Sequence, residues 1–515
     1  MNNLVVKVIK NRYIDSVSLM ALSTKANQVE GVSQAIIAMA TDMNKEVMGN
    51  VGLVNDLVAQ AQSSDLIITM KVSEGAEEET VLASVEELLT KKEKVETGAA
   101  EISYHTIDDA SQANHDATLA LISVNGAYAT REALQALNNN LNVMMFSDNV
   151  SVEDEIMLKD LALEKDLLMM GPDCGTAIIN HIGLGFANQV RQGAIGIIGA
   201  SGTGSQELSV RVHEFGGGIS QMLGTGGRDL SSEVGGRMML AGIDALAADP
   251  ETKVIVLVSK PPAEAVMNKI IEKAKSVDKP FVVWFVGEMA EKVEDNIHFE
   301  AMSKNAALKA VELAGVDLST VDLHALNLPL IAEVREKLAP EQQYIRGLFS
   351  GGTLAAEAYY TVKESYDNVY SNTANDPAHQ LQDIHHSQGH TFIDFGSDEY
   401  TDGKPHPMID PSNRIERFKQ EAQDPEVGVI LLDFVIGYGA HEDPVGAMAD
   451  VMKEAIDNAA AQGRHLEIIG YVLGTDLDSQ DLALQFEKLE NTGATYASSM
   501  QNAGLLAREF VRKEG

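Results

Sequence analysis

One unit of the sequence occurs twice, and this duplication constrains the fold more than any other feature. The stretch AIGIIGASGTGSQE (194–207) is an apolar strand pattern that leads into a glycine and hydroxyl turn and then into a helix pattern. The stretch GLFSGGTLAAE (347–357) has the same order. A further apolar run follows each copy, after Asp249-Pro250-Glu251 and after Asp424-Pro425-Glu426. Such alternation predicts two homologous domains built on parallel sheets covered by helices.

The second copy is longer than the first by 25 residues between its turn and its Asp-Pro-Glu motif. The extra residues are polar, and we expect an inserted loop at about 361–390. His385, His386 and His390 fall in this stretch. Because no cysteine or acidic framework at ligand spacing accompanies them, we expect a solvated insertion and no metal site.

The length of 515 residues is too great for a single core. Before residue 190, short apolar runs again alternate with helix patterns, which predicts another doubly wound domain. We therefore expect an α/β fold with three doubly wound domains, at 1–190, 191–335 and 340–515. The polar segment 332–346 is the expected linker between the last two.

The net charge of −37 argues against binding to nucleic acid or to an anionic membrane. An anionic substrate would need backbone N–H groups, helix N-termini or a few concentrated Arg and Lys side chains. The single cysteine, Cys174, is expected to be a buried packing residue because no base lies near it in the sequence. No apolar run has the length of a membrane span and the first residues lack a signal-peptide pattern, so we expect a cytoplasmic protein.

The two glycine and hydroxyl turns are the first candidate site. Exposed N–H groups and the positive end of a helix can bind a small phosphate without net positive charge. No Gly-Lys-Ser/Thr sequence follows either turn, so neither is a nucleotide-binding P-loop. The alternative is an ordinary strand-to-helix turn with a Ser or Thr cap. The candidate N–H donors are Ser201, Gly202, Thr203, Gly204, Gly352 and Thr353.

Two loops are further candidates, since the carboxyl ends of strands in open sheets are where ligands bind. The loop 224–236 holds Gly226, Gly227 and Arg228, whose planar guanidinium could grip a carboxylate or phosphate. The loop 394–418 is long and turn-rich. For both, the alternative is a surface loop without function. The candidate side chains of the second loop are Lys404, His406 and Arg414.

The chain resembles succinyl-CoA synthetase in several motifs. GPDCG (171–175), IGASGTG (198–204) and LGTGGRDL (223–230) resemble the α subunit, and SGGTLAAEA with IDFG resembles the carboxyl-terminal domain of the β subunit. The resemblance implies a Rossmann-like domain of the CoA-binding type followed by two flavodoxin-like domains. The ATP-grasp domain has no counterpart, which implies that the chain binds no ATP.

Longer stretches resemble the FdrA/AllF family. They are DSVSLM (15–20), LALISVNGAYA (119–129), LNVMMFSDNVSVEDEI (141–156), SKPPAEAV (259–266) and GKPHPMIDP (403–411). The resemblance implies one subunit of an oligomeric oxamate carbamoyltransferase, which works with two other subunits in allantoin degradation. The enzyme interconverts oxalurate plus phosphate with oxamate plus carbamoyl phosphate.

The residues favour the transferase over the acyl-CoA synthetase. The place of the CoA loop reads IKNRYIDSVSLM (9–20) without a glycine, which makes CoA doubtful. His298 matches the synthetase's phosphohistidine, but its flanking glycines are missing, and Lys260 stands where a glutamate would orient the ring.

Carbamoyl transfer requires no covalent intermediate and no cofactor or metal, only positioning and charge. We expect Arg228, Lys260, Lys404 and Arg414 as cations and His406 as a possible proton carrier. Two alternatives stay open. One is an ADP-forming acyl-CoA synthetase that uses His298, and the other is a non-catalytic scaffold.

Overall fold

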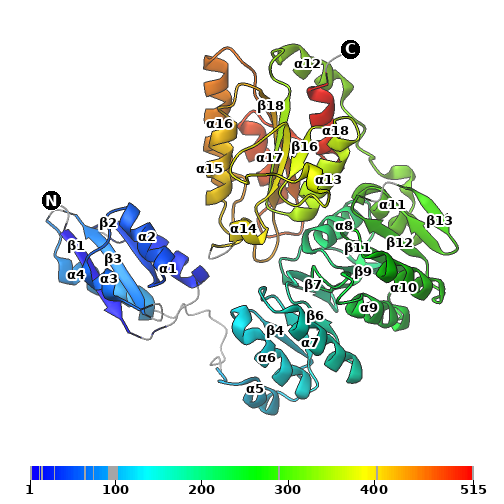
Figure 1. Cartoon of the computed structure of the whole chain (residues 1–515), viewed down its shortest axis with the longest axis horizontal. Helices are drawn as coiled ribbons and strands as arrows, with labels where there is room; N and C mark the ends of the chain where they lie inside the picture. The colour runs from blue at the N-terminus through cyan, green and yellow to red at the C-terminus, as the bar shows by residue number, and fades with distance from the viewer. Residues whose placement is uncertain are drawn as a thin grey trace. The chain divides into compact units, whose positions relative to one another are not determined.

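The structure is a computed structural model that describes residues 3–10, 12, 16–27, 29, 31–62, 65–73, 75–90, 103–287, 290–401 and 404–512. The chain forms two compact units (Figure 1). The first comprises Met1–Ser103 with Gly403–Pro405, and the second comprises Tyr104–Asp402 with His406–Gly515.

The first unit is a three-stranded sheet with helices. The strands are ordered β1-β3-β2, and β3 is antiparallel to both neighbours. Side chains of β3 are buried on both faces: Ile68 and Met70 pack with Ile37 and Val85, and Ile67 packs with a second cluster. The elements are β1 (Asn3–Ile9), α1 (Ser16–Asn27), β2 (Val32–Met39), α2 (Asp42–Asn50), α3 (Asp56–Gln60), β3 (Leu66–Val72) and α4 (Glu78–Thr90).

This unit differs from the doubly wound domain expected over 1–190. A short apolar run predicts a strand but does not fix the direction of its pairing, and here the strands pair antiparallel. Within the range 9–20, from which CoA was doubted, Ile9 ends β1 and residues 16–20 belong to α1. Because β1 pairs antiparallel with β3, it is not the first strand of a parallel sheet, so the missing glycine is no argument about CoA.

The second unit begins with a small parallel sheet in the order β4-β5-β6. Met169 and Val143 pack against α6 and α7 in its core. The elements are α5 (Ile107–Ala113), β4 (Leu119–Ile122), α6 (Gly126–Asn138), β5 (Asn142–Met145), α7 (Val152–Glu164) and β6 (Met169–Met170).

The largest sheet has the order β13-β14-β12-β11-β9-β10-β7-β8. Its central strands are parallel, and the hairpin β7–β8 joins β10 antiparallel. The elements are β7 (Thr176–Ile179), β8 (Ile182–Gly185), β9 (Gln192–Gly199), α8 (Gly202–Glu214), β10 (Ile219–Gly224), α9 (Arg237–Ala248), β11 (Val254–Ser259), α10 (Glu264–Lys275), β12 (Phe281–Phe285), β13 (Lys292–Glu294), β14 (Ile297–Phe299), α11 (Ser303–Leu313), η1 (Leu318–Thr320) and α12 (Leu328–Lys337).

The third sheet of this unit is fully parallel, in the order β16-β17-β15-β18-β19-β20. The elements are β15 (Tyr344–Phe349), α13 (Gly352–Lys363), β16 (Val369–Ser371), η2 (Pro377–His379), β17 (His390–Asp394), α14 (Asp398–Thr401), α15 (Ser412–Glu421), β18 (Val427–Val435), α16 (Gly446–Ala461), β19 (Glu467–Leu473), α17 (Leu482–Asn491), β20 (Thr495–Tyr496) and α18 (Met500–Phe510).

The strand orders agree with the duplication seen in the sequence. The run β10-β9-β11-β12 of one sheet corresponds to β17-β15-β18-β19 of the other, and each first strand leads through its turn into a buried helix, α8 or α13. The carboxyl ends of β9 and β15 therefore carry equivalent helix N-termini.

Two expectations near the third sheet were wrong. The stretch expected to be a solvated insertion contributes β16 to the sheet edge, and His390 is buried as the first residue of β17, where its Nδ1 accepts a hydrogen bond from the Ile345 N–H. The expected linker, 332–346, begins within α12, whose Val334 is buried in the third domain's core, and its last residues, 344–346, belong to β15. Amphipathic spacing hidden within a polar segment explains this difference.

Candidate functional site

The two turns of the duplicated unit lie against each other. Ser201 caps α8, its Oγ accepting a hydrogen bond from the Gly204 N–H at 3.2 Å. The same hydroxyl forms a hydrogen bond with the hydroxyl of Thr353 at the start of α13. The Thr353 N–H donates to Thr203 Oγ1 at 3.4 Å. The structure therefore brings together the N–H donors that the sequence singled out.

Glycines make this close approach possible. A Cβ on Gly351 would lie 2.6 Å from Thr203 Cγ2, and a Cβ on Gly204 would lie 3.0 Å from Thr353 Cγ2. Side chains at either position would separate the two helix N-termini. The N–H groups of Gly202 and Thr203 belong to the first turn of α8 and have no intrahelical acceptor, so they are suited to an anion.

A buried carboxylate lies beside the second turn. Asp394 ends β17, its Oδ1 accepts a hydrogen bond from the Gly396 N–H at 2.8 Å, and a Cβ on Gly352 would be 2.4 Å from its Oδ2. Burial raises the pKa of Asp394 to about 6, and the charge of Lys260 opposes this shift. This carboxylate can change its protonation near neutral pH.

Asp173 is a second such carboxylate. Its side chain is open to solvent, yet protein surrounds it closely enough that desolvation, with the charges of Asp148 and Asp398, raises its pKa to about 6. Lys260 and Arg228 act in the opposite direction. Lys260 thus influences both Asp173 and Asp394, and among the described residues it makes no ion pair within 4.0 Å.

Arg228 and the glycine loop rest on a buried charge network. Arg228 Nη2 donates to the Val150 carbonyl at 2.8 Å and pairs with Glu155 Oε2 at 2.9 Å, while nearly half of its side chain stays exposed. Lys159, fully buried, binds Glu155 at 2.7 Å and Asp229 at 2.8 Å. Asp229 in turn accepts the N–H groups of Met238 and Met239 at the start of α9.

Two glycines of this loop hold it close to the segment that carries Asp173. A Cβ on Gly226 would lie 2.3 Å from the Pro172 carbonyl oxygen, and Gly226 has a positive φ of 87°. A Cβ on Gly227 would lie 3.3 Å from Asp173 Oδ2. These glycines therefore shape the loop beside the carboxylate.

His406 lies close to Asp394. The Nδ1 atom accepts the Met408 N–H at 3.2 Å, which leaves the proton of the neutral ring on Nε2. A Cβ on Gly396 would lie 2.8 Å from His406 Nε2 and 3.1 Å from Asp394 Oδ1. Burial lowers the pKa of His406 to about 4, so at neutral pH the ring is uncharged and can donate from Nε2.

Three predicted residues are not gathered here. The guanidinium of Arg414 is buried and bound to Asp433, with Nη1 2.5 Å from Oδ1, so it stabilises the sheet instead of facing a ligand. His298 pairs in register with Val282 near the start of β12, whereas the turns follow the carboxyl ends of the strands. Lys404 belongs to the first unit and not to the unit that carries the paired turns.

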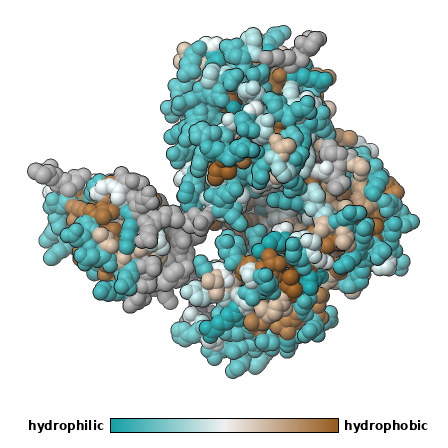
Figure 2. Space-filling model, in the orientation of Figure 1, coloured by the Kyte–Doolittle hydropathy of each residue, from teal (hydrophilic) through white to brown (hydrophobic). Residues whose placement is uncertain are grey.

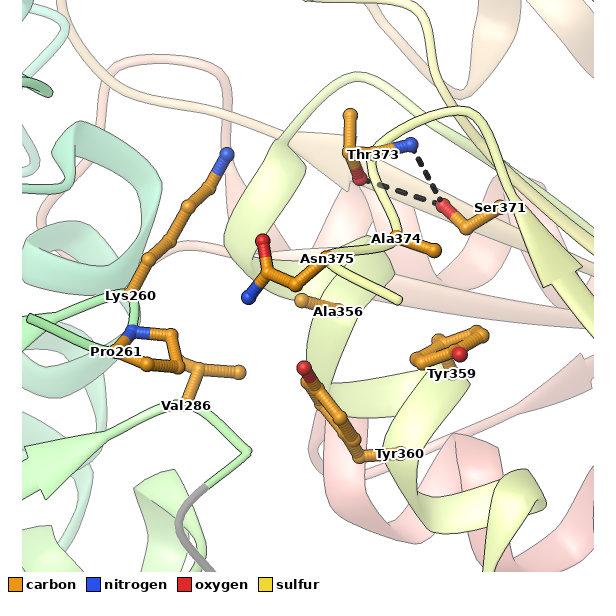
Figure 3. Close-up of a pocket in the computed structure, with 10 residues that line it drawn as sticks. All are labelled: Lys260, Pro261, Val286, Ala356, Tyr359, Tyr360, Ser371, Thr373, Ala374 and Asn375. Carbon is orange, nitrogen blue, oxygen red and sulfur yellow. Dashed lines mark hydrogen bonds between the residues drawn. The ribbon is translucent and has the colours of Figure 1, made fainter. Parts of the chain in front are cut away.

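A pocket opens beside the second turn (Figure 3). It encloses about 350 Å³ of empty space, part of it open to solvent. Lys260, Pro261 and Val286 line one side, and residues of α13 and of the segment after β16 line the other. In Figure 3 the amide of Asn375 lies between Lys260 and the ring of Tyr360.

A buried pair of glutamates was not predicted from the sequence. Glu207 and Glu357 occupy the same position in α8 and α13, the sixth residue of each helix. The Ser303 hydroxyl donates to Glu357 at 3.0 Å and lies 3.4 Å from Glu207. Burial raises the pKa of both carboxyls. The repeated Glu of GTGSQE and GTLAAE was the available signal.

Comparison with known protein families agrees with this architecture. Residues 1–104 match the AllF heavy metal-associated domain, residues 190–287 the CoA binding domain and residues 348–510 the CoA-ligase domain. The chain is 56% identical to the Escherichia coli (strain K12) protein YahF over 504 residues, 98% of each chain. The chain belongs to the FdrA/AllF family. The resemblance stated from the sequence is thereby confirmed.

The parallel sheets and their helices confirm the α/β fold class expected from the sequence. The chain is also similar to more distant proteins. The chain is 26% identical to the succinate–CoA ligase subunit alpha 1 of Archaeoglobus fulgidus over 240 residues, which is 46% of this chain and 80% of the ligase subunit. The solved structure of the ATP citrate lyase of Methanothrix soehngenii can be superposed over 79% of this chain and 83% of the lyase chain, with 14% sequence identity and a TM-score of 0.34.

Within the described ranges, no three His, Cys, Asp or Glu side chains are grouped so that they could hold a metal ion. None of the helices in the described part of the chain combines the length and the hydropathy of a membrane-crossing segment. Cys174 is buried, and burial raises the pKa of its thiol to about 12, as expected for a packing residue.

Proposed function

We propose that this chain is a subunit of an oxamate carbamoyltransferase and that the paired turns of α8 and α13 bind phosphate or carbamoyl phosphate. The single observation that carries this proposal is the direct contact of the two helix N-termini, with hydrogen bonds between Ser201, Thr203 and Thr353. Two positive helix ends directed at one place favour a small dianion in a chain of strongly negative charge.

The residues around the turns suit the chemistry. Phosphate oxygen attacks the carbamoyl carbon of oxalurate, the bond from that carbon to the oxamate nitrogen breaks, and this nitrogen takes up a proton. N–H donors and cations stabilise the oxyanion and hold the phosphate. Arg228 and Lys260 are the available cations. The Asp394 carboxyl group, with a pKa of about 6, can supply the proton, and the Nε2–H of His406 can donate a hydrogen bond.

Partner subunits are part of this proposal. Figure 2 shows hydrophobic residues at the surface of the second unit around α6 and α7. Exposed large hydrophobic residues on these helices are Tyr128, Met157 and Leu163. Apolar side chains grouped on a surface are typical of protein contacts, and we assign this area to one of the two other subunits.

The reaction can be measured directly. The chain, combined with the family's two partner subunits, is expected to form carbamoyl phosphate from oxalurate and inorganic phosphate. Arg228→Gln should raise the KM for phosphate about tenfold, as loss of one charged hydrogen bond would. Arg512→Gln, at an exposed arginine far along the sequence, is the matched control. A complete complex that makes no carbamoyl phosphate would contradict the proposal.

A second candidate is favoured by the matches to the CoA binding and CoA-ligase domains. An ADP-forming acyl-CoA synthetase would bind CoA and carry phosphate on a histidine, and His298 is the residue implied by the resemblance. Added CoA should then raise the melting temperature. A labelled phosphate donor should leave acid-labile label that His298→Asn abolishes. Absence of both signals removes this candidate.

A further inference from the structure

The pocket beside α13 has the construction of a binding site for a small anion. Lys260 brings a positive charge to its edge, and among the described residues no carboxylate lies within ion-pair distance of that charge. Its side chain is exposed and free to meet a ligand. An ammonium group at the mouth of a pocket favours a ligand carboxylate.

The other polar groups of the pocket suit a carbonyl or amide next to that carboxylate. Asn375, whose amide makes no hydrogen bond within the described part of the chain, lies between Lys260 and Tyr360 (Figure 3). Its amide can donate to a carbonyl oxygen and accept from an amide N–H. Thr373 brings a hydroxyl to the same wall.

The other residues that line the pocket are apolar or aromatic, and they limit the size of the ligand. Val286 lies on the side of Lys260, and Ala356 and the ring of Tyr359 lie on the opposite side. These side chains offer apolar contact to the part of a ligand that lies away from Lys260. A small planar anion fits these conditions better than a long acyl chain does.

The pocket is physically continuous with the turns. Ala356 is four residues after Gly352 on α13, so both lie on one face of the helix, one turn apart, about 6 Å. On the same side of the pocket, Asn372 precedes the lining residue Thr373 and holds the backbone of Asp394, accepting its N–H at 2.9 Å. A ligand seated in the pocket therefore reaches the α13 N-terminus within one helical turn.

We propose that the pocket of Lys260, Tyr360 and Asn375 binds the oxalyl group of the substrate, a carboxylate joined to a planar carbonyl, and directs its amide nitrogen to the α13 N-terminus. This assignment deepens the proposed function and rests on it. The carboxylate pairs with Lys260, and the carbonyl and amide contact Asn375. The transferred carbamoyl group then lies at the paired turns.

The test is calorimetric titration of the full chain with oxamate. Ala356→Leu fills the pocket with a larger side chain. Asn375→Leu removes the amide, and because Asn375 is exposed this change does not disturb the core. Each variant should bind oxamate at least about tenfold more weakly than the wild type. Ala378→Leu, exposed on η2, is the matched control and should bind oxamate normally. Inorganic phosphate should bind all three variants as it binds the wild type.

The outcomes separate the pocket from the reaction. Unchanged oxamate affinity in both Ala356→Leu and Asn375→Leu overturns the pocket assignment, as does a wild-type chain that binds succinate but not oxamate. If the three-subunit complex forms carbamoyl phosphate while the KM for oxamate is the same in both variants, the reaction stands and the pocket is wrong. If oxamate affinity falls as expected but the complex makes no carbamoyl phosphate, the pocket stands and the reaction is wrong.

Discussion

Asp394 is a carboxyl group whose ionisation should affect the stability of the fold. Burial raises its pKa from 3.8 to about 6, so between these values the folded chain binds more protons than the unfolded chain. Its contribution to the free energy of unfolding therefore falls as pH rises through this window and is lowest above about pH 6. A shift of about two units corresponds to about 3 kcal/mol.

The isosteric change Asp394→Asn removes this titration. We expect the free energy of unfolding of the wild type, relative to that of Asp394→Asn, to fall by about 3 kcal/mol from pH 4 to pH 7. Urea denaturation at a series of pH values measures the difference. Asp457→Asn, at an exposed position on α16, should leave the pH profile unchanged. A flat difference for Asp394→Asn would show that this carboxyl titrates normally.

Gly351 tests whether the contact between the two turns matters. Its Cβ would meet Thr203 Cγ2 at 2.6 Å, so Gly351→Ala must separate α8 from α13 or strain both. We expect a loss of about 1–3 kcal/mol of stability and a marked fall in phosphate affinity, measured by thermal unfolding and calorimetry. Gly49→Ala in α2, where the nearest atom is 3.9 Å away, is the control. Normal phosphate binding by Gly351→Ala would show that phosphate does not bind at the paired turns.

Single residues show where the sequence was sufficient and where it was not. The turn residues could be predicted because a strand, a Gly-Thr pair and a helix cap form a local pattern. Arg414 could not, because it lies on the helix α15 while its partner Asp433 lies on the strand β18, and burial is not visible in the sequence. The same limit applies to Asp394, since an aspartate after a strand is common and only its surroundings shift its pKa.

At the scale of elements, α7 and the glycine loop before α9 are joined by one buried cation. Lys159 neutralises Glu155 and Asp229, and all three side chains are almost completely buried. Lys159→Met would leave Asp229 buried without a cation and Glu155 with Arg228 alone, which costs about 3–5 kcal/mol. We expect a matching loss in urea denaturation, together with faster proteolysis within 224–236.

The matched control for this change is Lys253→Met, at an exposed lysine before β11. It should alter neither the urea midpoint nor the proteolysis rate. If Lys159→Met were equally harmless, the network would not be what holds the loop. Glu155 and Lys159 lie one turn apart on α7, but their partner Asp229 is about 70 residues away in the sequence, and only the structure brings the three together.

Strand direction is the main limit on prediction at this scale. The apolar runs of β1 and β3 have the same appearance as those of β9 and β11, and only the strand orders distinguish an antiparallel sheet from a parallel one. The duplicated unit was predicted correctly because its periodic pattern extends over a strand, a turn and a helix. The Rossmann-like assignment of the first 103 residues had no such support.

At the scale of the whole molecule, the two units have separate hydrophobic cores. Among the described residues, every buried apolar cluster lies within one unit: Ile68 and Ile67 belong to clusters of the first, and Leu431 and Val256 to clusters of the second. Units with their own cores unfold independently unless a large interface couples them. Scanning calorimetry of the full chain should therefore show two transitions.

The two transitions can be assigned with a shortened chain. A chain of residues 104–515 keeps every buried cluster of the second unit and should lose the transition of the first unit while retaining that of the second within a few degrees. Because the paired turns and the pocket lie wholly in the second unit, this chain should also bind phosphate and oxamate as the full chain does. A single cooperative transition in the full chain, or failure of 104–515 to fold, would show that the first unit is an integral part of the second unit's stability. The first unit would then act by stabilising the site in the second unit, and not by binding a separate partner.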